Sequence, residues 1–343
     1  MTQVPVPTTN LPPHESAAAE DARLHVIVSL DVEEEGLFSG RYATADCTAH
    51  NVSLLPRLAP LTRELGFPLS LLCTYTVFMN PDARVTLARM RDSLGAEIGA
   101  HLHHWNTPPT GPETSPPIPA DQLAPDVLRT RLRSLLRAGQ DFQGEPLRAF
   151  RMGRWDLKTA IRPLLAEEGI RVDSSVCPLR AFKNGPDHFL APADPYWAEA
   201  GLLEVPITQI ALHPRLPPAL HAIARALPEQ RGQRLLDSFR FWGALSVNPV
   251  WHSATVMRLA ARWHVTRGGK VLCLFWHSSE MMPGASPRIR TQEDADALLV
   301  RVYDFLRWLK ETYCARGITL AALAHDPTAQ SFPVRPADVC GDW

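Results

Sequence analysis

The chain has 343 residues, of which 45% are hydrophobic and 21% charged, and its formal net charge is -1. This length and composition are typical of one large globular domain or two ordinary ones. A net charge so close to zero excludes attraction to nucleic acid or to an anionic membrane through the bulk field. Because no apolar run is long enough for a membrane-spanning helix, we expect neither a nucleic-acid partner nor a membrane span.

Residues 1–22 are rich in proline, threonine, alanine and acidic residues, which predicts a flexible tail. They lack the basic and apolar regions of a secretory signal. None of the six cysteines forms a CxxC pair, and Cys73 and Cys273 lie in apolar runs, where reduced cysteine packs as a small hydrophobe. These features predict a reducing, cytoplasmic setting. Residues 331–343 are expected to form a loose C-terminal tail.

Short apolar segments alternate with amphipathic ones through residues 23–330, which we expect to form one α/β domain. The expected strands cover 24–30, 67–77, 97–100, 147–150, 170–172, 202–207, 271–275 and 318–324. The expected helices cover 51–65, 81–94, 121–142, 156–168 and 292–315. Residues 208–268 break this alternation and predict a mostly helical insertion.

Seven or eight mostly parallel strands with helical crossovers favour a distorted (β/α) barrel that is closed or nearly closed. An open, doubly wound sheet is the structural alternative. The sequence contains no GxGxxG after the first strand and no GxxxxGK[ST], so the usual support for a nucleotide-binding fold is absent.

Polar residues that suit chemistry follow the expected strands. Asp31 and Glu33 come after the first strand and, being two apart in extended chain, point to the same side. His101 and His103 follow the third strand with the same spacing. Since the carboxyl ends of parallel strands meet at one edge, we expect these side chains to lie together. For the first pair, a solvated acidic turn at the end of a strand is the alternative.

A carboxylate and two imidazoles, with positions left open for water, are typical of a catalytic divalent metal site such as zinc. We therefore predict a divalent metal, with zinc as the expected ion, held by Glu33, His101 and His103. His104 is the alternative for the second histidine. Asp31 then remains to serve as a base.

Three further polar residues follow later strands. Arg151 is a permanent cation that would keep Asp31 ionised, although it could instead lie at the surface, with Arg154 in its role. His277 suits a general acid, or it could be a structural residue at a strand end. Asp173 would hydrogen-bond a catalytic side chain or cap a turn. No GxSxG motif accompanies the serine pairs, so a serine hydrolase is not expected.

Five segments resemble, in their order, the motifs of the polysaccharide deacetylases, the NodB-homology family. These are SLDVEEE, GAHLHHW, FRMGRW, DSS and FWHSSE, and the resemblance spans roughly residues 24–325. It implies a distorted (β/α) barrel and metal-dependent removal of an acetyl group from an N-acetylated sugar. By position it implies that Asp31 is the catalytic base, Glu33 and His101 are metal ligands, Arg151 positions the base and His277 is the catalytic acid.

The sequence departs from the family's motifs in three places. Glu33 stands where the family usually has aspartate. The usual four-residue spacing of the histidine ligands leads from His101 to Trp105, so that His103 or His104 must substitute. The proline of the arginine motif is replaced within residues 151–154.

From these residues and this resemblance we expect a hydrolase that removes N-acetyl or similar acyl groups from a carbohydrate substrate. Hydrolysis of another non-peptide C–N bond, such as that of a cyclic amide, and a catalytically retired carbohydrate-binding barrel are the alternatives. We also expect four residues to contact the substrate: Arg154, Trp155, Asp173 and Tyr196. The aromatic residues of 208–268 would form a satellite core or roof the mouth of the barrel.

Overall fold

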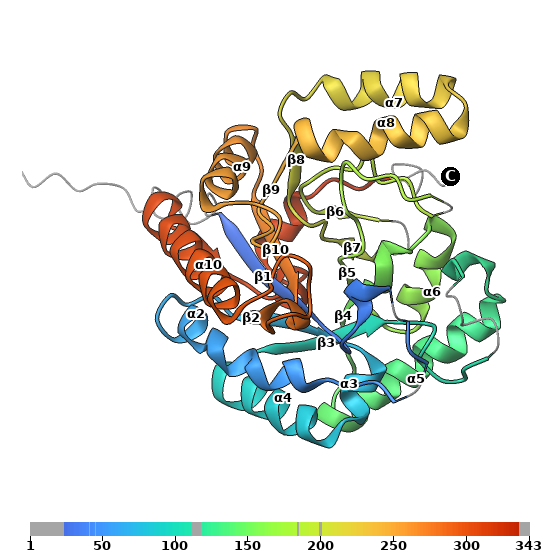
Figure 1. The fold of residues 1–343 in the computed structure, drawn as a ribbon, viewed down its shortest axis with the longest axis vertical. Coiled ribbons are helices and arrows are strands. Elements are labelled where there is room, and N and C mark those ends of the chain that lie inside the picture. The colour runs from blue at the N-terminus through green and yellow to red at the C-terminus, as the bar shows by residue number, and fades with distance from the viewer. Residues whose placement is uncertain are drawn as a thin grey trace, which may run out of the picture.

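A curled, mostly parallel sheet lies at the centre of the molecule, and helices cover its outer face (Figure 1). The structure is a computed structural model, and it describes residues 24–335 apart from 41, 45, 112–117, 184 and 199–200. The predicted tail at 1–22, and residues 336–343 of the predicted C-terminal tail, lie outside the described residues.

The main sheet has nine strands in the described residues, in the order β10-β1-β2-β3-β4-β5-β7-β6, with β11 paired to β1. All pairs are parallel except that between β6 and β7. The bounds are β1 His25–Val32, β2 Leu69–Cys73, β3 Glu97–Leu102, β4 Ala149–Met152, β5 Val172–Asp173, β6 Tyr196–Trp197, β7 Leu203–Glu204, β10 Val271–His277 and β11 Arg316–Gly317.

The helices run between the strands as a (β/α) arrangement requires. The α-helices are α2 Ala59–Arg63, α3 Tyr75–Met79, α4 Pro81–Leu94, α5 Pro125–Gln143, α6 Arg162–Glu167, α7 Leu216–Ala226, α8 Glu229–Trp242, α9 Ala254–Thr266, α10 Gln292–Tyr313 and α11 Leu320–Leu323. Short 3₁₀ turns are η1 Leu37–Ser39, η2 His50–Leu58, η4 Ala120–Gln122, η5 Gly153–Trp155, η6 Thr159–Ile161, η8 Ser278–Met281 and η9 Pro327–Ser331.

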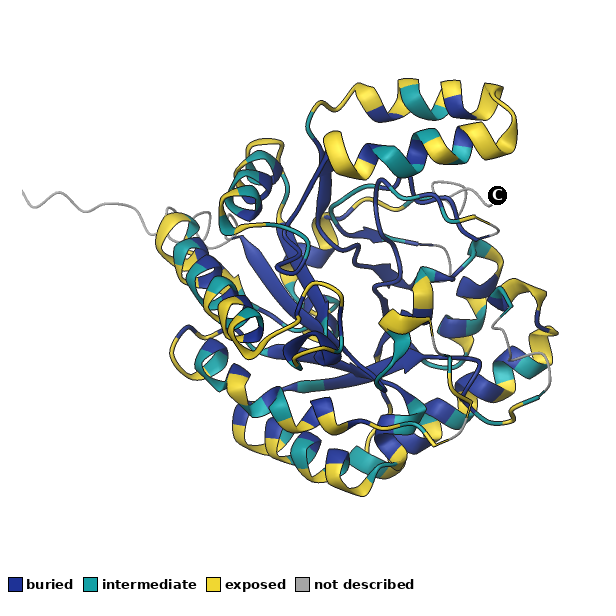
Figure 2. Ribbon diagram, viewed as in Figure 1, coloured by how far each residue is buried: buried dark blue, intermediate teal, exposed yellow. Residues whose placement is uncertain are grey.

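Strand β1 shows how the sequence builds both the core and the site. Its residues 26, 28, 30 and 32 pack in the apolar layer between the sheet and the helices. The alternate residues face the inside of the curl, where Ile27 joins an interior apolar cluster and is followed by Ser29 and Asp31. All of these positions are buried (Figure 2). The interior therefore changes from apolar to polar toward the carboxyl end of the strand.

The amino end of the barrel interior is covered by a segment near the C-terminal end of the described residues. The predicted strand at 318–324 is wrong, because this segment forms the short helix α11, whose Leu320 and Leu323 join the interior apolar cluster. The Glu97 carboxylate accepts backbone N–H bonds from Leu320 and Ala321 and so fixes the start of that helix.

The strand predicted at 67–77 is confirmed only in its first part. Strand β2 ends at Cys73, and the apolar residues from Tyr75 onward form α3. Helix α4 matches its prediction, since Asn80 accepts a bond from the Ala83 N–H and Gly95 ends the helix with a φ of 62°.

The sheet curls into a distorted, incompletely closed barrel, which confirms the predicted fold class. The alternative, an open and doubly wound sheet, is not what the structure shows. Between β7 and β10 the gap is bridged by Thr208, which exchanges hydrogen bonds with the Cys273 backbone. The inserted residues that follow contain α7, α8 and α9, and also a two-stranded sheet of β8 Gln209–Ala211 and β9 Ala244–Ser246. No helix in the described residues is both long and apolar enough to cross a membrane.

Candidate active site

A cavity of about 200 Å³ opens at the carboxyl end of the barrel. Its titratable lining consists of Asp31, Glu33, His101, His103 and His277. Apolar and aromatic side chains, together with one arginine, complete the lining: Leu37, Phe38, Tyr42, Trp105, Met152, Arg154 and Trp155. The acidic and histidine side chains that were predicted at the strand ends therefore lie together in this cavity.

Glu33, His101 and His103 form a group that can hold a divalent metal ion. Their ligand atoms all lie within 4.8 Å of one another, and the three residues are buried. The Glu33 Oε2 atom lies 3.5 Å from His101 Nε2 and 3.4 Å from His103 Nε2. A buried carboxylate facing two imidazole nitrogens is a donor set that suits a divalent cation.

The other ring nitrogen of each histidine is held by a partner behind it. His101 Nδ1 lies 3.0 Å from the Arg151 carbonyl oxygen, and His103 Nδ1 lies 2.8 Å from Glu34 Oε1. With Nδ1 donating to these oxygens, each Nε2 presents its lone pair toward Glu33, the arrangement typical of metal-binding histidines. The described residues thus fit a metal ion in the orientation of both rings.

Glu34 is a candidate site residue that the sequence analysis missed. Besides His103, its carboxylate accepts hydrogen bonds from Asn106 and Thr76 at 2.6 Å and 2.9 Å. Burial opposes ionisation of this group, but the charge and hydrogen bond of His103 lower the Glu34 pKa to about 2. The run of three glutamates after the first strand was its only signal in the sequence.

The alternative ligand His104 lies outside the group. Its Nε2 atom is 2.9 Å from the Ile118 carbonyl oxygen, and burial lowers its pKa to about 4. The metal group is therefore built with His103. Trp105, at the position that a four-residue spacing reaches, stacks on the His103 ring with centroids 4.2 Å apart.

Asp31 lies beside this group and is held by Arg151. The Arg151 Nη1 atom donates to Asp31 Oδ1 at 2.5 Å, and both side chains are buried. Burial alone would raise the Asp31 pKa, but the charges of Arg151, His101 and His277 lower it below its usual value. A carboxylate kept ionised in a buried cavity can accept a proton from water.

His277 also lines the cavity, with 3.9 Å between its Nε2 and Asp31 Oδ2. Its Nδ1 atom lies 2.9 Å from Glu280 Oε2, and its ring meets the Phe38 ring edge-on. Burial opposes protonation, but the charges of Glu33 and Glu280 raise the His277 pKa to about 10. A protonated His277 can donate a proton, and Glu280 is a second partner that the sequence analysis missed.

Gly153 allows the His103 ring to take its place. A Cβ atom at residue 153 would lie 2.5 Å from His103 Cδ2 and 2.8 Å from the Leu102 carbonyl oxygen. Any larger residue would have to displace the histidine or the neighbouring backbone. The glycine in the FRMGRW segment is thus required by the geometry of the metal group.

Comparison with known proteins gives matches among solved structures alone. No protein-family model matches the chain, and no curated protein matches it. A candidate polysaccharide deacetylase from Mycobacterium smegmatis has a TM-score of 0.56 and 16% identity, over 97% of this chain and 97% of that chain. A candidate polysaccharide deacetylase from Pseudomonas aeruginosa PAO1 has a TM-score of 0.51 and 15% identity, over 92% of this chain and 94% of that chain.

This chain has the NodB-homology deacetylase fold. Arg154 and Trp155, which were predicted to contact the substrate, are among the residues that line the cavity. Both have a positive φ, 60° and 61°, a strained backbone conformation for residues with side chains. The Trp155 ring packs edge-on against Phe275, and the Arg151 guanidinium lies 5.4 Å from the Trp155 ring centroid.

Asp173 and Tyr196 are not brought to the cavity of this NodB-homology fold. Both are fully buried, and neither is among the residues that line the cavity. The Asp173 carboxylate accepts a hydrogen bond from Ser175, whose hydroxyl in turn accepts the Met152 N–H, so Asp173 supports the backbone of β4. Tyr196 pairs with Glu204 across β6 and β7. Neither residue is part of the proposed site.

Proposed function

We propose that the protein is a metal-dependent hydrolase that removes N-acetyl or similar acyl groups from a sugar or a polysaccharide precursor. The observation that carries this proposal is the buried group of Glu33, His101 and His103 next to an Asp31 carboxylate that Arg151 keeps ionised. The likeness in fold to candidate polysaccharide deacetylases supports the same class of reaction.

Zinc is the ion we propose for the Glu33, His101 and His103 group, because two imidazoles and one carboxylate with room for water are ligands that catalytic zinc takes. When bound, the ion would supply Lewis acidity toward the amide carbonyl oxygen and toward water. The chain's own contribution is to hold each histidine ligand by a second hydrogen bond, from His103 to Glu34 and from His101 to the Arg151 carbonyl.

The proton transfers are assigned to two residues that are not ligands. Asp31 takes a proton from the attacking water as its oxygen bonds to the acyl carbon. His277, charged by its contact with Glu280, then gives a proton to the amide nitrogen as the C–N bond breaks. The products are the carboxylate of the acyl group and a free amine on the sugar.

The walls of the cavity suit a sugar ring better than a flexible apolar chain. Phe38, Tyr42 and Trp155 offer aromatic faces, and the Arg154 guanidinium lies 5.2 Å from the Tyr42 ring centroid. Aromatic faces pack against the C–H faces of sugars, while a guanidinium donates to their hydroxyl groups. We therefore propose Arg154 and Trp155 as substrate contacts.

A reducing, cytoplasmic setting remains part of the proposal. Cys47, Cys73, Cys177, Cys273 and Cys314 are the cysteines of the described residues, and none of them forms a disulfide there. The pattern agrees with a compartment in which thiols stay reduced. A cytoplasmic sugar precursor is accordingly the substrate we favour.

An assay of acetate release tests the proposal. The zinc-loaded protein is incubated with N-acetylated chito-oligosaccharides, and acetate and free amine are both quantified. We expect the two products in equal amounts, and release of both that is slower by roughly 10²–10⁴-fold in the Asp31→Asn variant. Hydantoin, a cyclic amide, is assayed in parallel for ring opening. Ring opening without acetate release would move the reaction to another C–N bond, and zinc binding without either product would indicate a retired site.

A further inference from the structure

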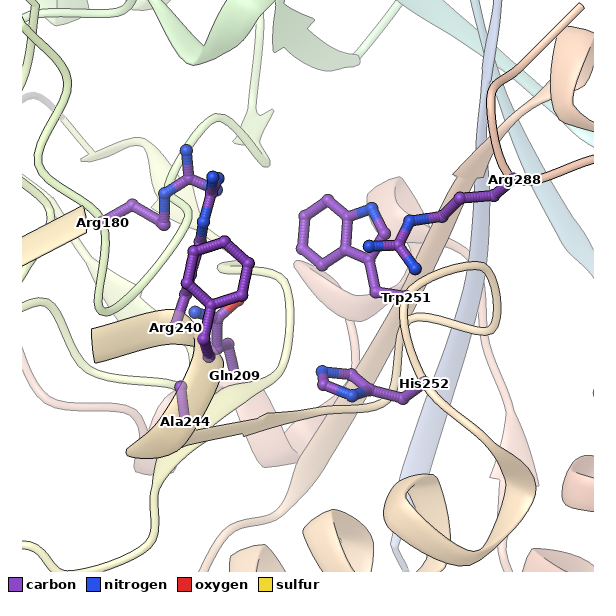
Figure 3. A pocket seen from close by; sticks show the side chains of 8 residues that line it. Arg180, Gln209, Arg240, Ala244, Trp251, His252 and Arg288 are labelled. Atoms are coloured by element: carbon purple, nitrogen blue, oxygen red, sulfur yellow. The ribbon is translucent and has the colours of Figure 1, made fainter. Parts of the chain in front are cut away.

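A second and larger cavity, of about 420 Å³, lies beside the candidate active site. We call it the arginine cavity, because Arg180, Arg240 and Arg288 line it together with His252, Trp251 and Gln209. Figure 3 shows Arg180 and Arg240 on one side of the opening, with Arg288, Trp251 and His252 on the other. Four of these six residues belong to the insertion at 208–268.

The three arginines come from parts of the chain that are distant in sequence. Arg180 lies between β5 and β6, Arg240 is in the last turn of α8, and Arg288 follows η8. In the described part of the chain, no carboxylate lies within ion-pair distance of any of the three guanidinium groups. The buried Nε of Arg180 has no hydrogen-bond partner there. Arg180 is half-buried while Arg240 and Arg288 are exposed, so water solvates much of this charge and the three guanidinium groups can meet an anion at one opening.

The charges of the arginines act on one another across the cavity. Burial is the largest factor that lowers the pKa of Arg240, and the charges of Arg180 and Arg288 lower it further, while Asp237 opposes them. Burial and the charge of Arg288 also lower the pKa of His252. The cavity is thus a region of positive potential with room for a ligand.

An aromatic wall connects this cavity to the catalytic residues. The Trp251 ring meets Phe275 edge-on with centroids 5.7 Å apart, and the Phe275 ring lies 5.3 Å from that of His277. Phe275 and His277 are two residues apart in β10 and so point to the same side of the strand. The buried Phe275 ring therefore contacts a lining residue of each cavity, Trp251 of the arginine cavity and His277 of the candidate active site.

We propose that the arginine cavity binds an oxyanion, a carboxylate or a phosphate, carried by the same molecule whose acyl group is removed. Guanidinium groups match both oxyanions with paired hydrogen bonds, while Gln209 and His252 offer further donors. Trp251 offers a face for the sugar ring that bears the charge. The claim that the oxyanion belongs to the substrate rests on the proposed function. The claim that the cavity binds an oxyanion is independent of that function.

Calorimetric titration tests the site without any need for turnover. The probes are glucuronate and inorganic phosphate, each titrated into the zinc-loaded wild-type protein and into Arg240→Gln and Arg288→Gln. The control is Arg234→Gln, which changes an exposed arginine of α8 outside the cavity. We expect one probe or both to bind, and each cavity variant to weaken binding roughly tenfold, the effect of losing a hydrogen bond to a charged group. The probe that binds more tightly identifies the oxyanion.

Binding that is equal in all four proteins, or no binding of either probe, would overturn the proposed site. A kinetic arm then tests the link to substrate, by comparing kcat/KM for a neutral N-acetylated tetrasaccharide with that for one containing hexuronate residues. We expect the charged substrate to be preferred, with the preference reduced roughly tenfold in Arg240→Gln and Arg288→Gln but kept in Arg234→Gln.

The two proposals fail in different ways. Acetate release from both tetrasaccharides with no preference, and no change in the variants, would contradict the anionic subsite and leave the proposed function standing. Arginine-dependent binding of glucuronate or phosphate without any acetate release would support the oxyanion site and contradict the proposed reaction.

Discussion

Arg151 and Asp31 form a buried ion pair at the centre of the candidate site, with 2.5 Å between Arg151 Nη1 and Asp31 Oδ1. The other two nitrogens of Arg151 also donate, since Nη2 donates to the hydroxyls of Ser29 and Ser174 at 2.9 Å and Nε donates to the Ser174 carbonyl oxygen at 2.8 Å. Asp31 is thus fixed in position and in charge by a side chain that reaches it from β4.

Replacing Asp31 by asparagine separates the base from the metal ligands. Asparagine keeps the shape of the side chain but cannot accept the proton, so we expect the rate of acetate release to fall roughly 10²–10⁴-fold. Zinc content, measured by atomic absorption, should stay near that of the wild type, because the side chains of Glu33, His101 and His103 are unchanged. A variant with normal turnover would show that Asp31 is only a polar strand end.

Replacing Arg151 by lysine tests the geometry of the ion pair. Lysine keeps the charge but cannot serve the four acceptors at once, so we expect the free energy of unfolding to fall by roughly 2–4 kcal/mol, together with a loss of turnover. Denaturant unfolding measures the first effect. The exposed Arg148 is the control, and its change to lysine should alter stability by less than about 0.5 kcal/mol. Equal stability of the two variants would contradict the network.

Gly153→Ala tests whether the glycine makes room for His103. The added Cβ would meet the His103 ring at 2.5 Å, so we expect zinc affinity to fall roughly 10–100-fold as the ligand shifts. The control is Gly284→Ala, which has a φ of 80° but no atom within 4 Å of the added Cβ. It should lose some stability from backbone strain and keep its zinc affinity. Unchanged zinc affinity in both variants would show that the close approach of residue 153 to the His103 ring does not affect the metal group.

The sequence identified the site because of a property of parallel sheets. Their strands end at one edge, so Asp31, His101 and His277 could be placed together without any knowledge of the packing. The partners behind the histidines were missed because Glu34 and Glu280 act through side-chain directions that strand periodicity does not determine. The choice between His103 and His104 depended on the turn that follows β3, where neither helical nor extended spacing applies.

The errors in the fold have physical reasons as well. The apolar run at 67–77 contains both β2 and α3, and short buried helices and strands share the same composition. The segment at 318–324 was read as a strand, yet it closes the amino end of the barrel as α11. The arginine cavity could not be predicted, since only tertiary contacts bring Arg180, Arg240 and Arg288 together.

Glu280→Gln tests the role of His277 through pH. Although burial opposes protonation, the charges of Glu33 and Glu280 raise the His277 pKa to about 10, so the general acid stays protonated below that pH. On the alkaline side of the profile, the rate of acetate release should therefore fall as pH rises through the His277 pKa. Glutamine removes one of the charges that raise this pKa, so the alkaline limb of a pH profile of kcat should move to lower pH. The control Glu293→Gln, at an exposed position of α10, should leave the limb in place. An unmoved limb in Glu280→Gln would contradict the assignment of His277 as the acid.

Stepwise addition of zinc to metal-free protein, followed by acetate release, tests the central claim most directly. We expect no activity without metal, a linear rise with added zinc, and saturation at about one equivalent, as for a single tight site. His104→Gln should follow the same course, because His104 lies outside the metal group, whereas His103→Gln should gain little activity at one equivalent. Full acetate release by the metal-free protein, or the same titration curve for His103→Gln and His104→Gln, would contradict the account.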